Sequence, residues 1–278
     1  MGNFHVLCHM ATLAKEMGCD WIRVPRKNIA TFYPKEKQEA HYDSEMPYGR
    51  TYGVWRNMFE FTDNEFYNFD KYCKELHLPW FTTIMDWDSF TFFDAAFQLP
   101  AYKIASCNAR NKPFLTKLAE HIPRNARIVA SVAGSTLEQV GELIDIFPEH
   151  KMTIMHCVAE YPVPTAHLRL GNISVLRETF ESARVSIGYS GHEMELAPSV
   201  IAARLGAVLI ERHFTLQRHK LFPRANVALE PDEFATLIKM VRSSSEVILP
   251  AEAFRVQFGM SEGEKNFLPL QEYKECQK

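Results

Sequence analysis

The stretch Ile187-Gly-Tyr-Ser-Gly-His-Glu193 carries the pattern from which the fold is predicted: a short apolar strand that ends in a polar cluster containing a histidine. Leu209-Ile-Glu-Arg-His-Phe-Thr-Leu216 repeats that pattern after the segment 194–205, whose apolar residues fall on one helical face. The carboxyl ends of adjacent parallel strands lie at one edge of a sheet, so we expect His192 and His213 to converge there. Two imidazoles at one edge indicate a divalent-metal site, and therefore an enzyme.

Apolar, β-branched segments alternate with helical patterns along the chain, which is typical of a parallel α/β fold. The strands are predicted at 20–24, 80–84, 102–105, 127–131, 153–157, 185–188 and 208–211. The helices are predicted at 6–17, 63–76, 111–122, 135–147 and 194–205, with a closing helix that opens at Pro231.

This order predicts a (β/α)₈ TIM barrel with its first strand missing, because the chain begins inside a helix. An open doubly wound sheet is the alternative. No Gly-rich phosphate loop follows any strand, and polar residues cluster at the strands' carboxyl ends, where barrels place their active sites. We predict a single domain over 1–278, with a long irregular insertion at about 25–62 that serves as a lid or interface, and a carboxy-terminal tail at about 250–278.

Composition narrows the class of protein. The net charge is −3 with acids and bases interspersed, so neither nucleic acid nor an anionic membrane is an expected partner. The six cysteines are scattered without a C-x-x-C pair, which favours reduced thiols over a disulfide framework or structural zinc. No apolar run approaches the length of a membrane span and no signal-peptide pattern is present, so we expect a cytoplasmic location.

The strand ends are rich in serines and cations, the groups that bind a phosphate or carboxylate. Several of these residues have an alternative interpretation as structural residues. Lys103 and Glu211 could form a structural ion pair, Asp86 could cap the helix after it, and Cys157 reads as a small buried hydrophobic residue. A single histidine at a strand end is more often structural than a ligand.

The two histidine motifs closely resemble the paired signatures of the N-acetylneuraminate (sialic acid) synthase family. Weaker matches follow in the same order and span roughly residues 10–235. They include Phe81–Ser89, Lys103-Ile-Ala-Ser106, Ser135-Thr-Leu-Glu138, Met155-His-Cys157 with Tyr161-Pro162, and Leu229-Glu-Pro231.

The resemblance implies a (β/α)₈ barrel followed by an antifreeze-like domain, in a domain-swapped homodimer. It implies condensation of phosphoenolpyruvate with the open-chain aldehyde of an N-acetylated hexosamine, with a divalent metal, expected to be Mn²⁺ with Mg²⁺ or Co²⁺ as alternatives, on His192 and His213. By the same match the catalytic carboxylates would be Glu138 and Asp86, the phosphoenolpyruvate ligands Lys103, Ser106, Ser131, Tyr161, Ser190 and Arg127, and the sugar ligands Arg23 and Arg224.

The chain also departs from the family pattern. It begins after the family's first-strand glutamate and ends at Lys278, without length for the antifreeze-like domain, so a homodimer is an option rather than an implication. Ala159 stands where the family has asparagine, and Arg224 where it has an acidic residue. Besides a nonulosonic acid synthase, two alternatives therefore stay open: a diverged homologue that binds metal and phosphoenolpyruvate without catalysis, and a class II-type metal aldolase.

Overall fold

The computed structural model describes residues 2–42, 49–218, 224–243, 250–260 and 264. The described residues fall into two compact units, an amino-terminal unit up to Tyr102 and a carboxy-terminal unit from Lys103 onward. Strand β3 (Ala101–Ile104) runs across the division. The prediction of a single domain remains a prediction. Within the described parts of the chain, no helix combines the length and apolar character needed to cross a bilayer.

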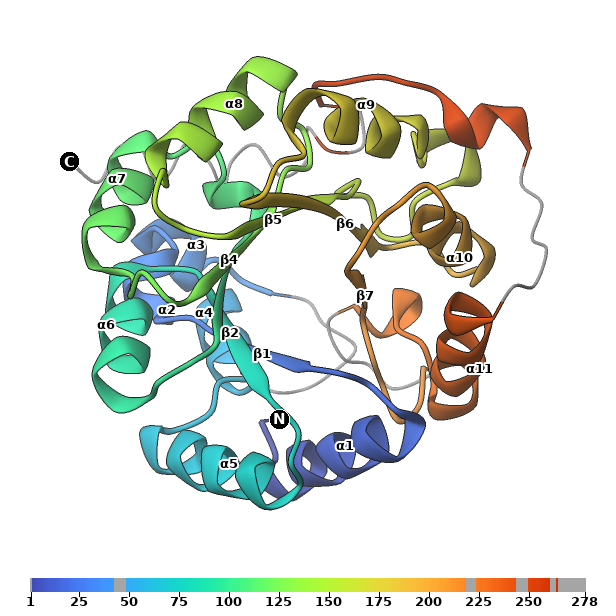
Figure 1. The fold of residues 1–278 in the computed structure, drawn as a ribbon. Helices are drawn as coiled ribbons and strands as arrows, with labels where there is room; N and C mark the ends of the chain where they lie inside the picture. The colour runs from blue at the N-terminus through green and yellow to red at the C-terminus, as the bar shows by residue number, and fades with distance from the viewer. Residues whose placement is uncertain (1, 43–48, 219–223, 244–249, 261–263, 265–278) are drawn as a thin grey trace. The chain divides into compact units, whose positions relative to one another are not determined.

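The amino-terminal unit contains two parallel strands and the helices that accompany them (Figure 1). Val24 of β1 lies opposite Thr82 of β2, and the Thr82 hydroxyl donates to the Val24 carbonyl at 2.9 Å. Helix α1 packs on α5, and α6 packs on β2. The elements are α1 (Phe4–Met17), β1 (Ile22–Arg26), α2 (Ile29–Phe32), α3 (Lys35–Glu39), α4 (Tyr52–Asn57), α5 (Asp63–Glu75), β2 (Trp80–Ile84) and α6 (Trp87–Ala96).

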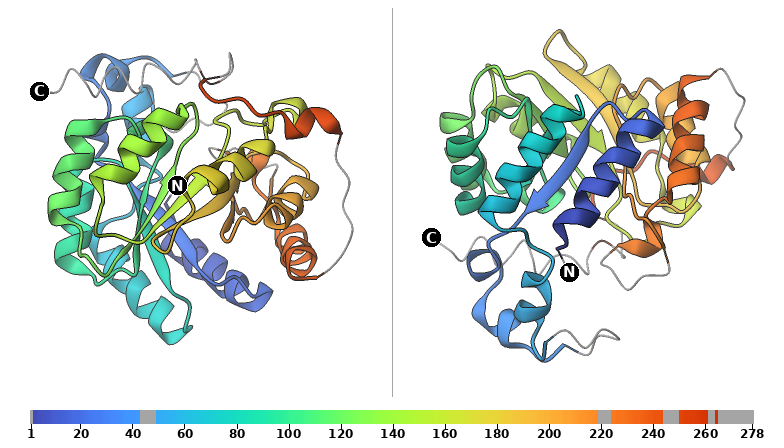
Figure 2. Two further views of the ribbon diagram at one scale, coloured as in Figure 1. Left: turned by 45° about the horizontal axis from the view of Figure 1, so that its top comes forward. Right: turned by 90° about the horizontal axis from the view of Figure 1, so that it is seen from below.

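The segment 25–62 was predicted to be irregular, but its described residues contain helices; residues 43–48 lie outside the described residues, and a role as a lid or interface stays a prediction. Its described residues include the end of β1 and three short helices, α2, α3 and α4, which gather beyond the carboxyl end of β1 (Figure 2). Aromatic side chains hold these helices together: Tyr52 lies edge-on to Tyr33 at 5.2 Å between ring centroids and 5.8 Å from Trp55. The aromatic residues supply an apolar contact that periodicity in such short helices cannot reveal.

Helix α6 was not among the predicted helices. The cap of a following helix had, however, been considered as an alternative role for Asp86. The Asp86 carboxylate accepts from the Ser89 amide at 2.8 Å, which is an N-cap hydrogen bond. Phe90 and Phe93 form the buried face of the helix.

The carboxy-terminal unit contains four parallel strands in the order β4-β5-β6-β7. Helix α9 packs on β6, and α10 packs on both β6 and β7; Figure 1 shows α8, α9 and α10 along the outer side of these strands. The prediction of a parallel α/β fold is confirmed. The elements are β4 (Arg127–Ser131), β5 (Met152–His156), β6 (Val185–Gly191), β7 (Ile210–Arg212), α7 (Lys112–His121), α8 (Leu137–Ile146), α9 (Gly171–Phe180), α10 (Ala197–Arg204) and α11 (Pro231–Arg242).

The described part of the predicted tail, 250–260, runs against α9. The Leu170 amide donates to the Ala253 carbonyl at 2.7 Å, and Asn172 exchanges side-chain hydrogen bonds with the backbone of Gln257. A Cβ on Gly171 would lie 2.2 Å from the Phe254 carbonyl oxygen, so only glycine permits this approach. The rest of the predicted tail lies outside the described residues, apart from Glu264.

We expect acid to destabilise the fold through His156, which is buried at the end of β5 and lies 2.8 Å from the Leu168 carbonyl. Burial lowers the pKa of His156 from 6.5 to about 4. The unfolded chain therefore takes up this proton before the folded chain does. The free energy of unfolding should fall by an amount on the order of 3 kcal/mol between pH 6.5 and 4.

Urea unfolding at several pH values tests this expectation. His156→Gln should reduce the slope of the unfolding free energy over that window, whereas His121→Gln, at an exposed position, should leave it as in the wild type. An unchanged slope in the His156 variant would contradict the assignment.

Candidate active site

The two predicted histidines converge. His192 follows β6 and His213 follows β7, and the register pairs Ser190 with Glu211 at the ends of these strands. The centroids of the two imidazole rings are 5.5 Å apart, with 35° between the ring planes. The expectation that adjacent strand ends bring them together is confirmed.

The surroundings of His192 favour a neutral imidazole. Its Nδ1 lies 2.6 Å from the Val158 carbonyl oxygen, which only accepts, so Nδ1 carries the proton and Nε2 the lone pair. Burial lowers the pKa of His192 from 6.5 to about 3, and the charges of Lys103 and Arg224 add to this effect. An imidazole held in this tautomer by a backbone carbonyl is typical of metal-binding histidines.

The two imidazoles are suitable ligands for a divalent metal, provided that further ligands complete the coordination shell. Nowhere in the described residues do three or more His, Cys, Asp or Glu side chains group in a way that could hold an ion. Two imidazoles alone leave most of a coordination shell to be filled. Substrate oxygens and water would have to complete it, which suits a catalytic site better than a structural one.

A buried charge pair lies beside the histidines. Lys103, at the end of β3, forms an ion pair with Glu211, and the Ser190 hydroxyl donates to the same carboxylate at 3.1 Å. The Lys103 side chain is only 7% exposed. The structure thus brings together the lysine and serine that we predicted for phosphoenolpyruvate, although Glu211 takes part of their hydrogen-bonding capacity.

Tyr161 lies between the histidines and Arg224. Its ring centroid is 4.3 Å from that of His192 and 6.2 Å from that of His213. The Arg224 guanidinium carbon lies 3.3 Å from the Tyr161 ring centroid, a cation–π contact. Arg224 has a φ of 68°, and the Asn226 side chain donates to the Tyr161 carbonyl at 3.3 Å. The predicted sugar ligand Arg224 therefore lies at the site.

Sequence reasoning missed a buried carboxylate at this end of the strands. Glu264 is 3% exposed and accepts from the Ala159 amide at 2.9 Å. It interacts electrostatically with Arg110 and with Cys157, whose thiol is hydrogen-bonded to Ser131. Burial raises the pKa of Cys157 to about 11, which agrees with a small buried residue rather than a nucleophile. No motif in the sequence marks Glu264.

One predicted residue of the same unit, Arg127, does not join this group, and the catalytic role of another, Glu138, stays a prediction. Arg127 opens β4, so it lies at the opposite end of the strand from Ser131, and it donates to Thr153 Oγ1 at 3.1 Å. Glu138 is exposed in the first turn of α8. Ser106, by contrast, lies two positions after the end of β3 and is half-buried.

The other two predicted residues belong to the amino-terminal unit. Arg23 donates to Thr83 Oγ1 at 2.8 Å. Besides capping α6, Asp86 accepts from the Asn28 amide at 2.8 Å, so both of its oxygens have backbone partners. These contacts describe structural roles, and the catalytic role of Asp86 stays a prediction.

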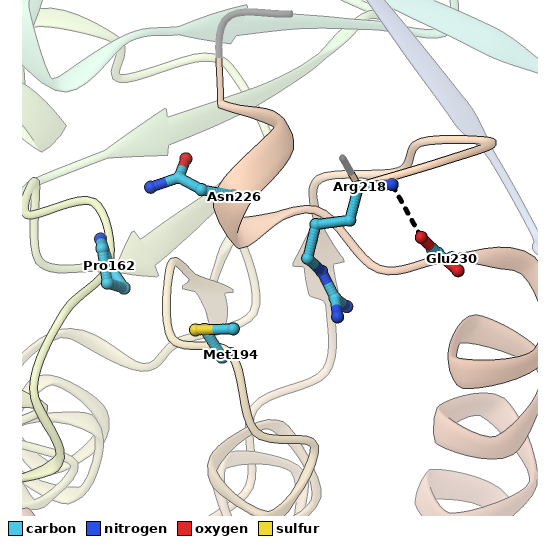
Figure 3. A pocket seen from close by; sticks show the side chains of 5 residues that line it. All are labelled: Pro162, Met194, Arg218, Asn226 and Glu230. Atoms are coloured by element: carbon cyan, nitrogen blue, oxygen red, sulfur yellow. Dashed lines mark hydrogen bonds between the residues drawn. The ribbon is translucent and has the colours of Figure 1, made fainter. Parts of the chain in front are cut away.

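An open hollow of about 540 Å³ adjoins the site (Figure 3). Two of its lining residues follow site residues closely in the chain: Pro162 is next to Tyr161, and Met194 is two positions after His192. The Arg218 amide donates to Glu230 at 2.7 Å on the other side of the hollow, as the dashed line in Figure 3 shows. The hollow has room for a bound small molecule.

Comparison with known proteins identifies the family of this chain. Residues 10–250 match the NeuB family. The chain belongs to the NeuB family. N-acetylneuraminate-9-phosphate synthase of Drosophila melanogaster is 33% identical over 227 residues, which are 81% of this chain and 59% of that protein. The human protein of the same name is 28% identical over 260 residues, 90% of this chain and 71% of that protein.

The fold of this NeuB-family chain is similar to that of a solved structure. The crystal structure of N-acetylneuraminic acid (sialic acid) synthetase from Leptospira borgpetersenii serovar Hardjo-bovis, in complex with citrate, aligns with a TM-score of 0.76 at 19% identity. The alignment covers 99% of this chain and 88% of that structure.

We expect Lys103 and Glu211 to be strongly coupled, because both side chains are largely withdrawn from water. A double-mutant cycle with Lys103→Met and Glu211→Gln, followed by urea unfolding, should give a coupling energy of about 1–3 kcal/mol. The exposed pair Lys112–Glu142, at 2.7 Å in the same unit, is the matched control and should couple by less than about 1 kcal/mol. Equal coupling in the two pairs would contradict the expectation.

Proposed function

We propose that this chain is a nonulosonic acid synthase: it condenses phosphoenolpyruvate with the open-chain aldehyde of an N-acetylated hexosamine, consumes water and releases phosphate. Membership of the NeuB family and the names of its relatives support the reaction class. The observation that carries the proposal is the convergence of His192 and His213 beside the Lys103–Glu211 pair. We also propose that the parallel strands belong to a (β/α)₈ barrel.

The roles of the chain's residues follow from their chemistry. Lys103 offers positive charge, and Ser106, Ser131 and Ser190 offer hydroxyl donors, for the carboxylate and phosphate of phosphoenolpyruvate. The Tyr161 ring, stacked under Arg224, forms an apolar wall that orients the substrates. Glu211, the partner of Lys103, would accept the proton that water loses when it adds to the cation formed by attack of the enol carbon on the aldehyde.

A divalent metal, with Mn²⁺ the first expectation, would be held by His192 and His213. When bound, it supplies Lewis-acid polarisation of the aldehyde oxygen. His192 contributes a neutral imidazole whose Nε2 is oriented by the Val158 carbonyl.

We predict one divalent metal per chain. Elemental analysis after incubation with Mn²⁺ and gel filtration should find close to one equivalent in the wild type and almost none in His213→Ala. His167→Ala, at an exposed histidine of the same unit, is the control and should retain the metal. Equal metal content in His213→Ala and the wild type would remove this site.

We predict that phosphate is released from phosphoenolpyruvate only when an N-acetylhexosamine and Mn²⁺ are both present. The panel should contain free and 6-phosphorylated N-acetylhexosamines, because the fly and human relatives are named as 9-phosphate synthases. Ser190→Ala should lower the rate by about 10-fold or more, since it removes a donor at the substrate. Cleavage of a keto-acid without phosphate chemistry would instead indicate a class II-type metal aldolase.

One observation favours a second candidate, a homologue that binds metal and phosphoenolpyruvate without catalysis. The Glu264 carboxylate accepts from the Ala159 amide close to the predicted anion ligands, where it would repel an anionic substrate. The phosphate assay separates the candidates: no release across the whole panel, with metal still bound, supports this second candidate.

A further inference from the structure

A second set of polar side chains lies behind the histidines. Alternate residues of a strand point to opposite faces, so Tyr189 and Arg212 point away from the face that carries Ser190 and Glu211. There they meet Glu193, the residue after His192, and Ser199 of α10. Arg212 in turn directly precedes His213.

These side chains form one buried network around an ion pair. Arg212 Nη1 lies 3.0 Å from Glu193 Oε1, and both side chains are 0% exposed. The Tyr189 hydroxyl donates to the other carboxylate oxygen of Glu193 at 2.9 Å. The Arg212 guanidinium also donates to the backbone carbonyls of Glu193 and Glu195, so it holds the loop after His192 directly.

Stability alone does not account for this pair. A buried ion pair is often no more stabilising than well-packed apolar side chains of the same volume. Within the described residues, the buried Nε of Arg212 has no hydrogen-bond partner, which adds to the free-energy cost of burying the guanidinium. Gly191 is also constrained by the pair, because a Cβ there would lie 2.5 Å from Glu193 Oε1.

We propose that Glu193 and Arg212 are positioning residues that fix the separation and orientation of the His192 and His213 imidazoles. The ion pair joins the residue after one histidine to the residue before the other, so the two ring-bearing segments cannot shift independently. This inference rests on the metal site proposed above. Loss of a side chain that hydrogen-bonds a metal ligand commonly weakens metal binding by about 10- to 100-fold, and we expect an effect at the lower end of that range here, because the pair acts on the ligands through the backbone.

The test compares five proteins: the wild type, Arg212→Lys, Arg212→Met, the apolar pair Glu193→Leu with Arg212→Met, and Arg177→Met as control. Arg177 of α9 pairs with Glu181, and its side chain is 40% exposed. Mn²⁺ titration gives the metal Kd, the visible spectrum of bound Co²⁺ reports ligand geometry, and urea unfolding reports stability. The NMR signals of the His192 and His213 rings, assigned with His→Gln variants, give a readout without metal.

The double variant Glu193→Leu with Arg212→Met (the apolar pair) is the decisive protein. It leaves no buried charge unpaired, so it should fold. We expect it to bind Mn²⁺ about 10-fold or more weaker than the wild type, with a shifted Co²⁺ spectrum and shifted ring signals. Arg212→Lys, which keeps the charge but not the fork of donors, should show a smaller loss of affinity, and Arg177→Met none.

A folded apolar pair with wild-type Kd, spectrum and ring signals would overturn the inference. If the wild type binds no metal, the proposed function fails, and the ring signals still test the positioning role. Should the apolar pair fail to fold, Arg212→Lys takes its place: wild-type affinity and ring signals in that variant overturn the inference, and changes in both support it.

Discussion

The pairing of β6 with β7 is the constraint on which the site depends. Its register sets Ser190 opposite Glu211 and Gly191 opposite Arg212. One face of the two strands therefore carries the groups that would meet substrate, and the other carries the groups that pack against α10. A shift of one residue would exchange the two faces, burying His213 and placing Arg212 at the site.

Two glycines make this pairing possible. A Cβ on Gly188 would lie 2.4 Å from Met155 Sδ and 2.8 Å from the Leu209 carbonyl, so the strand has no space for a side chain there. Gly191 leaves room for the Glu193 carboxylate. The motif Gly-Tyr-Ser-Gly-His-Glu thus combines packing requirements with chemistry, which is why so short a stretch predicts so much of the site.

The sequence predicted the elements whose pattern is local. Strand β4 was predicted at its observed bounds because Arg127–Ser131 is a short segment with the β-branched residues Ile128 and Val129 and with clear ends. Strand β6 extends three residues beyond its predicted end, since Tyr189–Gly191 gain their pairing from β7. Helix α6 was not among the predicted helices because its phenylalanines contact the aromatic core on several sides and give no clean stripe.

The residues of the site also differ in how far a local sequence pattern predicts them. The histidines were predictable because each directly follows a strand, and parallel strands end at one edge. Glu264 was not, because it reaches Ala159 across 105 positions of the chain and no local pattern encodes such a contact. Arg127 does not join the site for a geometric reason. A five-residue strand is roughly 15 Å long, so a residue at its amino end is far from the carboxyl edge of the sheet. A resemblance between sequences does not show which end of the strand a side chain occupies.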